Sequence, residues 1–144
     1  MTATSIRWGF AALATILAQV TLIALSILCV AVYSYTIRTG ETPEFYNAFA
    51  QASAPWVSLI AGGPVFFLIA RWMRRRSPAS AFGTAMAMCA FYLAIEIATL
   101  LLWPSGSSAV RAILPFMIGG FVLKVAGAWL GAGGSPARAS ARTA

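Results

Sequence analysis

Several residue types that carry protein chemistry are scarce or missing from this sequence. Among its 144 residues there is no histidine and no aspartate, and only three residues are acidic. Acid–base and nucleophilic catalysis usually need a histidine or a carboxylate beside the reacting group, so we expect that the chain is not an enzyme. The same shortage removes most metal ligands, and we expect no metal and no cofactor.

Cysteine is also rare, and its positions exclude two further classes of protein. Cys29 and Cys89 are the two cysteines, and each lies inside an apolar run. Neither belongs to a CxxC motif or to a cluster of cysteine and histidine, which argues against a disulfide scaffold and against a zinc site.

Apolar residues, by contrast, are abundant, at 60% of the chain against 9% charged residues. Crossing the hydrocarbon core of a bilayer takes about 20 helical residues. Continuous apolar runs without the alternation of a barrel strand predict helices. We therefore expect an all-α integral membrane protein, an up-down bundle of four transmembrane helices within residues 1–132. The predicted spans are residues 8–37, 55–72, 79–103 and 112–131, followed by a disordered basic tail over 133–144.

The net charge of +7 indicates orientation rather than nucleic-acid binding, because the arginines flank apolar runs. One side of the membrane receives Arg7, Arg71, Arg74, Arg75, Arg76, Arg138 and Arg142, and the other only Arg38 and Arg111. This bias predicts that both termini lie in the cytoplasm. Tryptophan favours the membrane boundary, and all five tryptophans fall at predicted span ends: Trp8, Trp56, Trp72, Trp103 and Trp129. High alanine, glycine and arginine content hints at a bacterial source, and hence at the inner membrane.

The segment around the second span carries several helix signals. The first span is about twice as long as the apolar core of a signal peptide, so we expect it to stay as an anchor. Thr42-Pro43-Glu44 resembles a helix start and predicts a short helix on the outer membrane surface. Ser53 and Pro55 predict a break before the second span, and Gly62-Gly63-Pro64 predicts a kink within it.

Glu96 and Lys124 are the ionisable side chains that lie well inside predicted spans. Each costs about 2.5 to 3.5 kcal/mol to insert, so each needs a reason to be there. Their backbones differ in depth by roughly 10 to 15 Å, yet side chains lean toward the N-terminus of their own helix, and these two lean toward each other. We predict a direct or water-bridged pair. It either fixes helix register or handles an ion, a proton or a substrate; unpaired, snorkelling charges are the third alternative.

Helical spacing gathers further candidates around this pair. A mildly polar seam is predicted from Gln19, Cys89, Tyr92 and Thr99. Interhelical hydrogen bonds would explain most of it, and a solvated path along it is the alternative. Close helix packing is predicted at Gly83, Gly120, Gly127 and Gly131, and binding of anionic lipid head groups at Arg74, Arg75 and Arg76.

Two functions remain open from the sequence. The first is an accessory or structural subunit that packs against a larger membrane complex or its own copies. The alternative is a small oligomeric transporter or channel that uses Glu96 and Lys124. The expected partners are lipids and membrane proteins, with anionic lipids at the cytoplasmic face.

Overall fold

Four helices make up the described part of the protein. The computed structural model describes residues 6–102 and 107–134, with side chains in the second range from Ile113 onward. Its helices are α1 (Trp8–Thr36), α2 (Pro43–Arg76), α3 (Ala81–Leu102) and α4 (Ser107–Ala132). Each is long and apolar enough to cross a membrane, α4 from Ile113 onward. The prediction of four apolar helices is confirmed; Trp103 and most of the predicted tail, 135–144, lie outside the described residues.

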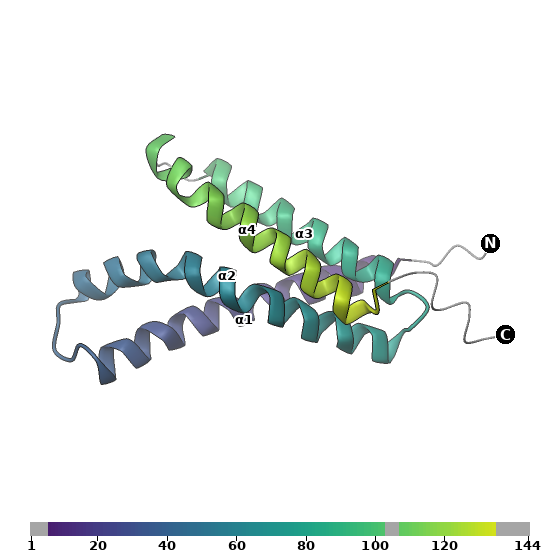
Figure 1. Cartoon of the computed structure of the whole chain (residues 1–144), viewed down its shortest axis with the longest axis horizontal. Coiled ribbons are helices and arrows are strands. Elements are labelled where there is room, and N and C mark those ends of the chain that lie inside the picture. Colours follow the sequence, from purple (N-terminus) through teal and green to yellow (C-terminus); the bar gives the residue numbers. More distant parts are fainter. Residues whose placement is uncertain (1–5, 103–106, 135–144) are drawn as a thin grey trace.

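The helices run back and forth between two ends of the molecule (Figure 1). At one end α1 begins, α2 and α4 finish, and α3 starts; we call it the arginine end because Arg7, Arg71 and residues 74–76 lie there. At the opposite end, the far end, α1 turns into α2 and α4 begins. Central in the packing is α2, which contacts all three other helices, whereas α1 and α4 do not touch within the described residues.

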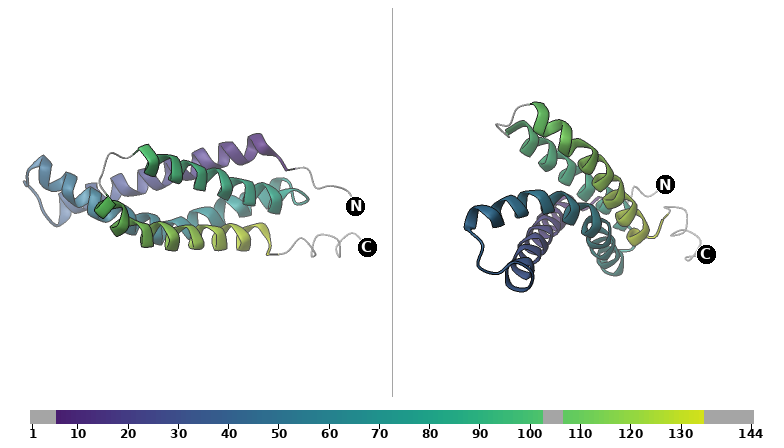
Figure 2. Two further views of the ribbon diagram at one scale, coloured as in Figure 1. Left: turned by 90° about the horizontal axis from the view of Figure 1, so that it is seen from above. Right: turned by 60° about the vertical axis from the view of Figure 1, so that its left-hand side comes forward.

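The buried core occupies only the half of the molecule next to the arginine end. On α1 the buried residues stop at Leu22, and on α3 they stop at Tyr92. On α2 they begin at Gly62, and on the described part of α4 they begin at Gly120. Toward the far end the α1–α2 pair and the α3–α4 pair diverge (Figure 1 and Figure 2). The molecule is therefore a packed bundle at one end and two separate helix pairs at the other.

Helix α2 corrects two predictions from the sequence. It begins where Thr42-Pro43-Glu44 indicated, with the Thr42 side chain accepting a hydrogen bond from the Phe45 amide. The predicted break before Pro55 is wrong, because the helix continues unbroken to Arg76 through Pro55 and Pro64. The expected short surface helix is instead the first part of α2. A proline inside a helix removes one backbone hydrogen bond and can bend the helix without ending it. Accordingly, α2 bends between its ends (Figure 2).

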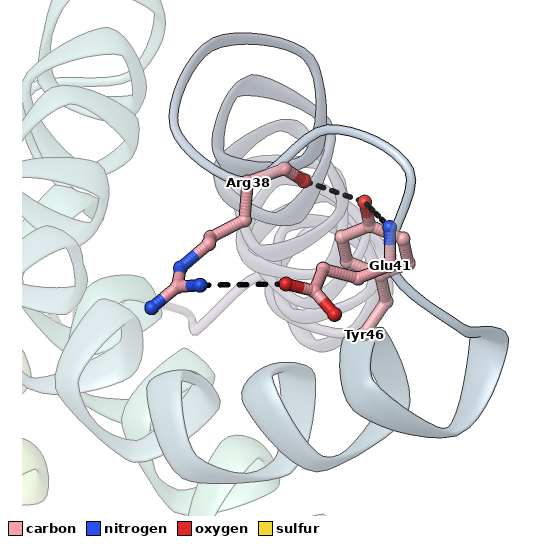
Figure 3. Close-up of polar contacts among 3 residues, drawn as sticks. All are labelled: Arg38, Glu41 and Tyr46. Carbon is pink, nitrogen blue, oxygen red and sulfur yellow. Dashed lines mark hydrogen bonds and ion pairs between the residues drawn. The ribbon is translucent and has the colours of Figure 1, made fainter.

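The turn between α1 and α2 is organised by one tyrosine (Figure 3). The Tyr46 hydroxyl donates to the Arg38 carbonyl and accepts a hydrogen bond from the Glu41 amide at 3.2 Å. The Arg38 guanidinium lies 3.4 Å from the Glu41 carboxylate, in an exposed ion pair. Beside this turn the ring of Tyr33 on α1 stacks on Phe49 of α2, with ring centroids 3.8 Å apart. These contacts hold the two long helices together at the far end.

Candidate functional site

The candidate site is built around the lysine of α4. The Lys124 ammonium donates a hydrogen bond to Glu96 Oε1 on α3 at 2.8 Å and another to Ser58 Oγ on α2 at 3.0 Å. It also lies 4.5 Å from the centroid of the Tyr92 ring on α3, where a cation is attracted by the ring face. The ammonium therefore joins three helices at one point.

Both charged groups of the Lys124–Glu96 pair lie mostly out of contact with water. Lys124 is only 1% exposed and the Glu96 side chain 16%, so neither charge has a full water shell. An ion pair of this kind offsets the cost of removing both charges from water only with good geometry and additional hydrogen bonds. The lysine meets that condition. The carboxylate meets it in part, because Glu96 Oε2 is buried and has no hydrogen-bond partner within the described part of the chain.

The ion pair lies at the boundary of the core. Glu96 follows the last buried residue of α3, Tyr92, by one helical turn, and Ser58 precedes the first buried residue of α2, Gly62, by one turn. Beyond this level the two helix pairs diverge (Figure 1). The Lys124 contacts therefore close the core on the side of the far end.

Glycine on α2 makes room for the lysine stem. A Cβ at Gly62 would lie 2.9 Å from Lys124 Cε and 3.0 Å from its Cγ, so the lysine stem would have to shift to admit it. At Gly120, on α4 itself, a Cβ would lie 3.7 Å from Lys124 Nζ and 3.9 Å from the Leu59 Cα, which is ordinary contact. The Gly62-Gly63-Pro64 sequence thus has a packing role besides the kink predicted for it.

Below the ion pair, α2 and α4 cross with their backbones in contact. A Cβ at Gly127 would fall on the carbonyl oxygen of Gly63, and one at Gly131 would fall on that of Phe67. The GxxxG spacing on α4 therefore lies in a helix–helix contact, the geometry for which small residues are favoured in membranes. The predicted packing residue Gly83 lies elsewhere, near the start of α1, where its Cβ would meet the Ile6 side chain at 3.1 Å.

The residues of the predicted polar seam do not form one continuous path. Tyr92 joins the ion pair, and Cys89 is buried in the core one turn away. Thr99 is exposed, and its hydroxyl bonds back to the Ile95 carbonyl of its own helix at 2.8 Å. The Gln19 Oε1 is buried and has no donor in the part of the chain that the structure describes. Thr15, which the sequence places on the same side of α1 as Gln19, donates a hydrogen bond from its hydroxyl to the Met88 carbonyl of α3 at 3.2 Å.

The arginines predicted to hold lipid head groups are in different surroundings. Arg74 and Arg75 line a hollow at the arginine end, together with Arg71 and Pro78. Arg76 is directed elsewhere, with its guanidinium 4.9 Å from the centroid of the Trp72 ring.

Sequence reasoning missed the α2 side of the site. Ser58 and Gly62 are one turn apart and share a face of α2, which is the only local signal that they belong together. Within the described residues, no group of three histidine, cysteine or acidic side chains is placed to hold a metal ion.

Comparisons of the chain with family models, with curated proteins and with solved structures gave no match.

Proposed function

We propose that this protein is an accessory or structural subunit of a membrane assembly, in which a partner packs against the far half. One observation carries this proposal: the core is confined to the arginine half, so the far halves of all four helices contain no buried residue among those described there. A bundle that is complete by itself buries a stripe along the whole length of its helices.

The far half of α2 has the composition expected of a helix–helix contact. Ala48 and Ala52, one turn apart, are exposed, and so are the amide side chains of Asn47 and Gln51. Lipid tails are as apolar as leucine, so helices in membranes associate through small residues and interhelical hydrogen bonds. These four residues provide both, which favours a protein partner over lipid alone.

Affinity purification tests this proposal. The tagged protein is extracted from native membranes in mild detergent, and the mass and composition of what accompanies it are determined. We expect a stoichiometric larger assembly that is lost with Ala52→Leu and kept with Ala90→Leu, a matched change at an exposed position of the packed half. A partner that withstands Ala52→Leu would contradict the proposed interface, and a lone monomer would contradict the function.

A second function is favoured by one specific observation, the buried Glu96 Oε2 that has no donor among the described residues. A carboxylate oxygen in that position can accept a proton or a hydrogen bond from a transported species, and intramembrane carboxylates often serve this purpose. In this alternative the protein is an oligomeric transporter or channel. Purification would then yield a homo-oligomer, and Glu96→Gln would abolish transport while leaving the protein folded.

We further propose that the protein lies in the cell's inner membrane with its arginine end in the cytoplasm. Five arginines lie at that end, whereas the far end has Arg38, which is paired with Glu41, and Arg111 near the start of α4. In a variant with Cys29 and Cys89 replaced by alanine, Thr39→Cys should react with an impermeant maleimide applied to intact cells. Ala79→Cys, at an exposed position of the arginine end, should react only after the membrane is opened. The reverse labelling pattern would mean that the arginine end faces away from the cytoplasm.

A further inference from the structure

The last turns of α2 carry three arginines that line one hollow. Arg71, Arg74 and Arg75, at helical spacings of three and four, share a face of α2. With Pro78 they surround a cavity of about 320 Å³ that opens to the outside. The Arg74 guanidinium also packs against the residues that follow α4. A Cβ at Gly133 would lie 3.1 Å from its Nη1.

Two other arginines at this end, Arg7 and Arg76, contact side chains of the protein itself. The guanidinium of Arg76 lies over the Trp72 ring. Arg7 donates to the Ser77 hydroxyl at 2.8 Å and lies 5.5 Å from the centroid of the Phe10 ring. Arginines are therefore not equivalent at this end of the molecule.

No acidic side chain of this chain can neutralise the three arginines. The sequence has three acidic residues. Glu41 and Glu44 lie at the far end, and Glu96 is paired with Lys124 at the boundary of the core. The hollow therefore receives no negative charge from an acidic side chain of this chain.

We propose that the hollow binds the phosphate of an anionic phospholipid head group. Guanidinium groups form paired hydrogen bonds with phosphate oxygens, and basic pockets at the ends of transmembrane helices suit such head groups. Trp72, one residue beyond Arg71, is of the type that marks the membrane boundary, where lipid phosphates lie. The cavity is larger than one phosphate ion and accommodates part of the head group. This site is independent of the proposed partner, which would bind at the other end.

Lipid retention tests the site. The protein is solubilised with equal amounts of phosphatidylglycerol and phosphatidylcholine, and the lipids that stay bound are counted by native mass spectrometry. We expect a preference for phosphatidylglycerol that falls about fivefold with each of Arg71→Gln, Arg74→Gln and Arg75→Gln. Arg76→Gln removes the same charge one residue away and should keep the preference.

Three outcomes would overturn the proposal. An equal loss with Arg76→Gln would mean general attraction to a basic surface. Displacement of phosphatidylglycerol by millimolar inorganic phosphate would mean a site for free phosphate. A preference unchanged in the Arg71, Arg74 and Arg75 variants, with helicity by circular dichroism unchanged, would mean that the hollow binds no lipid, and an acidic protein surface would become its candidate occupant.

Discussion

Replacing Lys124 by methionine is expected to lower the free energy of unfolding by about 3 kcal/mol. The methionine has nearly the volume of the lysine stem beside Gly62, so packing changes little. The loss arises because Glu96 keeps a mostly buried carboxylate without its cation. Unfolding by increasing fractions of sodium dodecyl sulfate in mixed micelles, followed by circular dichroism, measures this change.

Two further variants separate the ion pair from the general effect of a lost charge. The double variant Glu96→Gln with Lys124→Met should recover most of the stability, because no charge is then left unpaired. Breaking the exposed pair by Arg38→Gln should cost less than about 1 kcal/mol. If Lys124→Met were as stable as the unchanged protein, the ion pair would not hold the three helices together. If the double variant folds but loses a measurable transport activity, that loss would favour the transporter or channel over the accessory subunit.

Replacing Gly127 by alanine is expected to destabilise the protein by about 2 kcal/mol, which is large for one methyl group. The added Cβ would fall on the carbonyl oxygen of Gly63, a backbone atom that moves only if α2 and α4 separate. Separation would also weaken the Lys124 contacts with Ser58, one turn beyond the crossing. The thermal midpoint in detergent, with loss of helicity as the signal, should fall accordingly.

Gly119→Ala is the matched control on the same helix. Its Cβ would lie 3.4 Å from the Leu59 Cδ1, an ordinary contact with a movable side chain. Since alanine favours helix by about 1 kcal/mol over glycine, this variant should be neutral or slightly stabilised. Equal midpoints for the two variants would show that the helices do not cross at Gly127 as closely as the structure has it.

The helices could be predicted from the sequence because each depends on a local property, an apolar run of sufficient length. The course of α2 could not, because a serine followed closely by a proline is the same local signal whether a helix starts there or continues through the proline. A proline removes only one helical hydrogen bond, so the helix can continue through it and bend.

The sequence indicated the site residues whose type is rare in membrane spans. It did not indicate those whose role depends on how the helices pack against each other. Glu96 and Lys124 are conspicuous because few charges lie in the spans. Ser58 and Gly62 carry no such mark, and which face of α2 meets α4 depends on tertiary packing. The confinement of the core to one end was equally hidden, because helices that are apolar on every side do not show which face will be buried.

The central position of α2 bears on how the protein is made. Helices enter the membrane in chain order, so α1, α2 and α3 are in place before α4, the last of the four helices. Until then Glu96 has no cation, Ser58 lacks the ammonium that it binds, and the Gly63 carbonyl faces no second backbone. A chain interrupted before Lys124 thus exposes an intramembrane carboxylate that the finished protein conceals, a difference by which cellular quality control can distinguish the two.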